Sequence, residues 1–198
     1  MIPAARLQAA IEVLDAVFEA VKNNGRAADD VLRTYFRTRR YAGSKDRRAV
    51  GELVYGVLRD YQRISWALGQ WNSQTEGDHK ARAYFVAHLA LNDGIDINLF
   101  TGEGYGPKVL WEFEKALILK ITELDGPPLY ARANCPMWLM EMMDKRFKFN
   151  TGAELLALNE RAPLDLRINT LKSNVGNVLH ILLNDKYKRK VTPLSPHG

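Results

Sequence analysis

The sequence has little cysteine and no long apolar run, and each absence excludes a class of protein. Cys135 is the single cysteine among 198 residues, so no disulfide can form within the chain. No run of eighteen apolar residues occurs, which argues against a membrane-spanning helix. The segment 4–24 is apolar only periodically and is interrupted by charges, unlike a secretory signal. We therefore expect a soluble cytoplasmic protein.

Acidic residues are scarce in one part of the chain. Residues 33–48 hold seven basic side chains and a single acidic one, whereas the whole chain has a formal net charge of +5. The basic residues are Arg33, Arg37, Arg39, Arg40, Lys45, Arg47 and Arg48. A local concentration of positive charge is typical of a surface that binds a polyanion. A solvated helix face would give the same pattern, and both interpretations stay open at this point.

Apolar residues at three- and four-residue spacing predict helices over most of the first 160 residues. The expected helices span about 4–24, 28–40, 45–58 with a continuation to 71, 79–92, 108–124, 136–147 and 151–161. Ser44 is the expected N-cap of the third helix. The inward residues of the first helix are predicted to be Leu7, Ile11, Leu14, Val17, Phe18 and Val21.

The pattern changes after Pro163. Apolar and polar residues alternate over 164–171, which predicts a strand, followed by a helix at 174–184 and a second strand at 187–194. The sequence thus predicts a mainly α fold, with a helical domain over 1–147, then a linking helix and the start of a small α/β unit over 148–198. Because two strands make a poor independent sheet, we expect the chain to stop partway through a larger protein.

Three features that imitate catalytic or binding motifs are better explained as structure. The glycines of 102–106 lack a preceding strand and are followed by proline, so they predict a loop and not a nucleotide site. Cys135 fits a small residue at a helix entrance better than a nucleophile. The four histidines show no metal-ligand spacing, so we expect no metal site.

Four motifs resemble one known family. They are G-S-K-D-R-R at 43–48, Y-G-V-L-R at 55–59, C-P-M-W-L at 135–139 and A-P-L-D-L-R-I-N-T-L-K at 162–172. In this order they resemble the N-terminal region of the Sun/Fmu (RsmB-like) ribosomal RNA methyltransferases, whose first domain is similar to the antitermination factor NusB. The resemblance covers nearly the whole chain.

The resemblance implies a function for the parent protein. Family members transfer a methyl group from S-adenosylmethionine to the 5-position of cytosine in RNA, using two cysteines and a glycine-rich loop of a later domain. None of those residues can be carried over to this sequence, so no catalytic or cofactor-binding residue is assigned. The chain is expected to bind ribosomal RNA, to contact its own C-terminal catalytic domain, and to be inactive alone.

The expected RNA contacts are the basic residues of 33–48 together with the exposed aromatic Tyr41, since Tyr35 and Phe36 fit the core better. Arg167, Asn169 and Lys172 are further candidates. For Arg167 and Asn169, contact with RNA and contact with the catalytic domain stay equally open.

Two other functions compete with this interpretation. A NusB-like transcription or ribosome-assembly adaptor would bind RNA together with a protein and catalyse nothing, but it gives no reason for the strand at 164–171. A helical interaction domain could instead present the basic residues to an acidic protein. The sequence does not indicate an oligomeric state.

Overall fold

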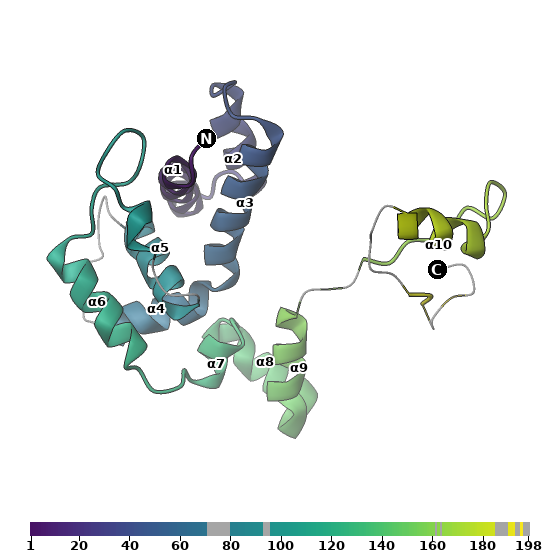
Figure 1. Ribbon diagram of the computed structural model, residues 1–198. Helices are drawn as coiled ribbons and strands as arrows, with labels where there is room; N and C mark the ends of the chain where they lie inside the picture. The colour runs from purple at the N-terminus through teal and green to yellow at the C-terminus, as the bar shows by residue number, and fades with distance from the viewer. Residues whose placement is uncertain are drawn as a thin grey trace. The chain divides into compact units, whose positions relative to one another are not determined.

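A computed structural model describes residues 1–70, 80–92, 96–160, 162, 164–184, 190–192 and 195. The chain falls into two compact units, Met1–Asn159 and Glu160–Gly198 (Figure 1). The regular structure of the described residues is helical, without any β-strand, which confirms a mainly α fold. The domain boundary at residue 147 stays a prediction. None of the described helices is long and apolar enough to cross a membrane.

The first unit is built around its N-terminal helix. That helix, α1, packs against α2, α3 and α5, and α5 in turn packs against α4 and α6 (Figure 1). The elements are α1 (Pro3–Lys22), α2 (Ala28–Arg37), α3 (Ser44–Arg59), α4 (Tyr61–Gln70), α5 (Lys80–Leu91), η1 (Ile97–Leu99) and α6 (Glu112–Thr122).

The core of this unit follows the helical spacing of the sequence. The predicted inward residues of α1 are buried except Val21, and they pack in one cluster with Val50, Val54 and Val57 of α3 and with Phe85 and Val86 of α5. Each such side chain contributes about 1.5–3 kcal/mol when fully buried. Val21 is exposed because it lies in the last turn of α1, so its predicted burial is wrong.

Helix α3 begins differently from the prediction. Gly43, and not Ser44, is its N-cap, and the backbone N–H of Gly43 donates to Oδ2 of Asp46 at 3.3 Å. A carboxylate three residues into a helix satisfies the N-cap N–H as half of a capping box. The predicted continuation exists, but α3 ends at Arg59 and α4 starts at Tyr61.

Glycine 56 of the Y-G-V-L-R motif has a packing role. A Cβ atom added at Gly56 would lie 3.1 Å from Nε2 of His88 on α5, so the imidazole ring occupies the space that a side chain would need. On its other side the ring reaches Asp60, whose Oδ2 lies 3.3 Å from Nδ1 of His88. The motif thus allows α5 to lie close to α3.

A buried ion pair joins α5 to α6. Arg82 donates to Glu114 through two hydrogen bonds, Nε to Oε1 at 2.7 Å and a terminal nitrogen to Oε2 at 2.8 Å. The same terminal nitrogen donates to the carbonyl of Val109 at 3.0 Å, and the backbone N–H of Trp111 donates to Glu114 at 2.9 Å. Both side chains are buried. These bonds satisfy two charges that would otherwise be costly inside the protein.

Four further helical elements follow α6 in the first unit, as far as it is described. They are α7 (Leu129–Arg132), which the sequence analysis missed, α8 (Met137–Phe147), η2 (Lys148–Asn150) and α9 (Thr151–Asn159). Ala133, Cys135 and Leu155 form a separate small core there. The side chain of Asn134 accepts the backbone N–H of Gln62 at 2.8 Å, which ties this region to α4.

The second unit has one described helix, α10 (Val175–Asn184). Asn174 caps it, because its Oδ1 accepts the backbone N–H of Asn177 at 2.9 Å. Residues 164–169 have no regular structure, so the strand predicted at 164–171 is wrong for this structure. A strand needs a hydrogen-bonded neighbour, and none of the described residues supplies one. Most of the second predicted strand, 187–194, lies outside the described residues.

Candidate nucleic-acid interface

The basic segment 33–48 runs from the last turn of α2 through a turn into the first turn of α3. Three of its arginines are paired with carboxylates. Arg33 lies 2.7 Å from Asp30, Arg48 lies 2.9 Å from Glu52, and Arg39 lies 3.5 Å from Glu12 of α1. Asp30 and Glu52 lie just outside the segment in the sequence, and Glu12 lies on α1. Each of these ion pairs offsets the positive charge of one arginine.

The single acid within the segment forms no ion pair with the basic residues of the segment. Oδ1 of Asp46 accepts Nε of Arg6 at 2.9 Å and the N-terminal ammonium of Met1 at 3.1 Å. These two hydrogen bonds hold the pKa of Asp46 below its ordinary value. The negative charge of Asp46 is therefore directed toward α1, and it leaves the basic segment without an internal counterion.

We expect the contacts of Asp46 to make stability depend on pH. A carboxylate whose pKa is lowered by folding stabilises the protein above its unfolded pKa of about 4, and this contribution is lost as the pH falls. Asp46→Asn should therefore lower the urea midpoint at pH 7, and the difference from the unmodified chain should shrink toward pH 3. Glu103→Gln, at an exposed carboxylate, is the control. A difference that stays constant with pH would contradict this role.

Two arginines of the segment brace the turn itself. Nε of Arg47 donates to the carbonyl of the buried Ala42 at 2.9 Å. Arg39 donates to the carbonyl of Tyr35 at 3.3 Å, and its guanidinium lies 3.7 Å from the centre of the Tyr35 ring. Tyr35 is half-buried and Phe36 is buried, as predicted. Arg39 and Arg47 thus hold the turn in shape.

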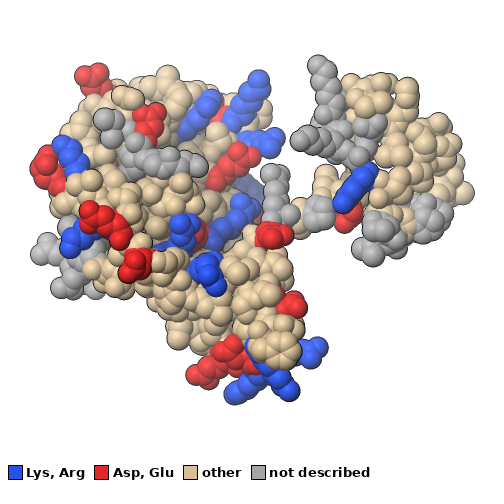
Figure 2. Space-filling view, turned by 60° about the horizontal axis from the view of Figure 1, so that its bottom comes forward, with Lys and Arg blue, Asp and Glu red and all other residues tan. Residues whose placement is uncertain are grey.

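Three cations of the segment 33–48 have no side-chain partner among the described residues. Arg37, Arg40 and Lys45 are exposed, and between them Tyr41 is 73% exposed. We call residues 37–45 the basic turn. Figure 2 shows that Lys and Arg gather in groups on this view of the first unit, with Asp and Glu beside some of them. The basic turn combines exposed positive charge with an exposed aromatic ring, which suits phosphate contact and base stacking.

The candidates of the second unit have different surroundings. Arg167 and Lys172 are exposed, without a partner among the described residues. The side chain of Asn169 is engaged locally, because its Oδ1 accepts the backbone N–H of Leu171 at 3.1 Å. This bond fixes the turn before α10, and the Asn169 side chain is otherwise exposed.

The glycine-rich loop and Cys135, which the sequence did not favour as catalytic or binding motifs, have structural explanations. Gly102 and Gly104 have φ angles of 68° and 56°, and a Cβ at Gly106 would lie 2.6 Å from the Thr101 hydroxyl, so the loop needs these glycines. Burial raises the pKa of the Cys135 thiol, which disfavours the nucleophilic thiolate. Among the described residues, no group of His, Cys, Asp or Glu has the arrangement of a metal site.

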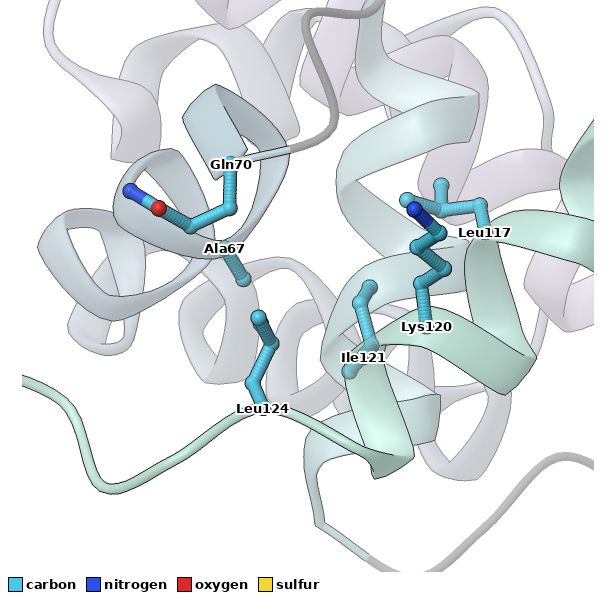
Figure 3. Close-up of a pocket in the computed structure, with 6 residues that line it drawn as sticks. All are labelled: Ala67, Gln70, Leu117, Lys120, Ile121 and Leu124. Atoms are coloured by element: carbon cyan, nitrogen blue, oxygen red, sulfur yellow. The ribbon is translucent and has the colours of Figure 1, made fainter.

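A small pocket opens between α4 and α6 (Figure 3). Its lining residues are Ala67, Gln70, Leu117, Lys120, Ile121 and Leu124. The volume of about 20 Å³ corresponds to roughly one water molecule, which is too small for a nucleotide or for S-adenosylmethionine.

Comparison with known proteins agrees with the motifs. Residues 135–198 match the ferredoxin-like domain of RsmF/B-like methyltransferases. The chain is thus similar to RsmB-type ribosomal RNA methyltransferases. Two relatives are the ribosomal RNA small subunit methyltransferases B of Erwinia tasmaniensis and Cronobacter sakazakii. Each is 24% identical to this chain over 170 residues.

These matches confirm the resemblance to the Sun/Fmu group and set its extent. The aligned regions cover 76% and 77% of this chain but 38% and 39% of the two relatives, so the chain spans less than half of their length. No solved structure matches the chain. The likeness of the first unit to NusB therefore stays a prediction.

Proposed function

We propose that this chain binds ribosomal RNA through the basic turn and positions it for a methyltransferase domain. The observation that carries the proposal is the group of exposed cations Arg37, Arg40 and Lys45, which have no partner among the described residues and lie beside the exposed Tyr41 in the sequence. Contacts of this kind fix the position of an RNA backbone without reading its sequence. The relatives, named as methyltransferases of small-subunit ribosomal RNA, support that RNA as the ligand.

The wider proposal follows from the resemblance. The whole protein would transfer a methyl group from S-adenosylmethionine to the 5-position of cytosine, in the cytoplasm, with the catalytic residues outside this sequence. The helical region to residue 147 would hold RNA. The unit that follows would contact either RNA or the catalytic domain through Arg167 and Asn169, and both options stay open, whereas Lys172 would contact RNA.

The salt dependence of binding tests the proposal. Each phosphate that a cation neutralises adds about 0.7–0.9 to the slope of log affinity against log salt. Three cations predict a slope of about −2 or steeper, which is a loss of roughly tenfold or more between about 50 and 200 mM salt. The measurement is a fluorescence titration of the intact chain with transcribed small-subunit ribosomal RNA. Affinity independent of salt, or no binding, would remove the proposal and favour a protein partner.

A further inference from the structure

The connection between α8 and α9 ends in an exposed aromatic ring. Phe149 lies in η2, and its side chain is 92% exposed, more than that of any other aromatic residue in the described part of the chain. The neighbouring Phe147 is half-buried instead, so the segment holds one ring inward and projects the next. Such exposure of a large apolar side chain has no role in the fold of the first unit.

The backbone that presents this ring is strained and braced. Lys148 has φ 53° and ψ −125°, a conformation that residues with a side chain rarely adopt. Its carbonyl accepts the hydroxyl of the buried Thr151 at 2.6 Å, and its N–H donates to the carbonyl of Asp144. Strained residues persist only where the surroundings hold them, and they concentrate at functional sites. The contacts around Lys148 therefore hold Phe149 in its exposed position.

Positive charge is concentrated in the sequence immediately before the ring. The six residues 145–150, which we call the α8 tip, include three cations and no acid: Lys145, Arg146 and Lys148. All three are exposed, and none has an ion pair in the described part of the chain. Asp144 and Glu154 flank the tip as exposed carboxylates without forming such pairs with it. A ring among cations complements a base joined to phosphates, and not an apolar groove of a protein.

We propose that the α8 tip is a second RNA contact, in which an unpaired base stacks on Phe149 while Lys145, Arg146 and Lys148 meet the adjoining phosphates. This contact goes beyond the basic turn and presumes that the chain binds RNA. It gives the two surfaces different tasks. The basic turn holds the backbone of any RNA, whereas the α8 tip favours single-stranded loops, whose bases are free to stack.

Phe149→Ala in the intact chain tests the proposal. The probes are an RNA hairpin with an unpaired loop that carries 2-aminopurine, and a fully paired duplex of equal length. We expect Phe149→Ala to weaken hairpin binding by about 5- to 100-fold and to abolish quenching of the 2-aminopurine, with duplex binding unchanged. Phe149→Trp should retain both affinity and quenching. Tyr105→Ala removes another exposed ring, in the loop 101–107, and is the matched control.

The outcomes separate this proposal from the proposed function. If Phe149→Ala binds both the hairpin and the duplex as tightly as the unmodified chain does, the proposed RNA contact at the α8 tip is wrong, and the proposed function is unaffected. An equal loss of affinity for both RNAs would have the same meaning. Failure of the unmodified chain to bind either RNA would overturn both proposals. Capture of a protein through the tip, with RNA binding intact in Phe149→Ala, would also count against it.

Discussion

Reversing the three unpaired cations of the basic turn together, as Arg37→Glu, Arg40→Glu and Lys45→Glu, should weaken binding of small-subunit ribosomal RNA by on the order of 100-fold. Each lost contact with a phosphate removes about one unit of the salt slope, so the slope should also become shallower by about 2 to 3. These side chains have no partner in the described residues, and their replacement leaves no buried group unsatisfied. The fold should therefore survive, which circular dichroism checks.

A matched variant shows whether the position of the charge matters. Lys108→Glu, Lys115→Glu and Arg132→Glu change the net charge equally at exposed sites on other parts of the first unit. We expect a loss of less than about tenfold there, because distant surface charges are screened. Equal losses in the two triple variants would mean that overall charge, and not the basic turn, governs binding. Reversal of Arg39 and Arg47 is unsuitable, since both also support the turn.

Removing the buried carboxylate between α5 and α6 should have the largest effect on stability. Glu114→Ala leaves the guanidinium of Arg82 buried without its counterion, which costs about 3–5 kcal/mol. The guanidinium keeps the carbonyl of Val109 and the faces of Phe100 and Trp111, at 5.1 and 4.6 Å from the ring centres, but none of these balances its charge. Urea unfolding followed by circular dichroism measures the loss.

Two further variants establish the origin of that loss. Lys115→Ala removes an exposed ion pair with Glu112 on the same helix and should cost less than about 1 kcal/mol. Arg82→Met combined with Glu114→Leu removes both charges and should recover most of the stability, since apolar replacements of buried pairs are often tolerated. If the double variant is as unstable as Glu114→Ala, shape and not charge dominates this contact.

The sequence predicted the helices of the first unit well because their cores repeat every three to four residues. Leu7, Leu14 and Val17 are where the spacing placed them. The short helix α7 was missed, since four residues hold too little periodicity to recognise. The strand at 164–171 was predicted from alternation alone, and alternation does not supply the hydrogen-bonded neighbour that a strand requires.

The sequence predicts the basic residues of 33–48 as one set. The structure separates those that form ion pairs with carboxylates from those that do not. Glu12 is remote from Arg39 in the sequence, so only the fold reveals that the two are paired. Likewise, Asp46 reads as a neutralising residue within the segment, although it is bound to Arg6 of α1. The α8 tip is not evident from the sequence because Phe149 falls between the two helices predicted at 136–147 and 151–161, and only the backbone of Lys148 shows that the chain turns outward there.

The contact between Gly56 and His88 links two positions that are far apart in the chain. A side chain at position 56 would collide with the imidazole ring, so the two residues can change only together. In a more distant relative, a bulkier residue after the tyrosine of the Y-G-V-L-R motif implies a smaller residue on the helix that corresponds to α5. When a related sequence lacks this glycine, the positions that correspond to 56 and 88 should be aligned together. An alignment that relies on the glycine alone would place such a sequence in the wrong register.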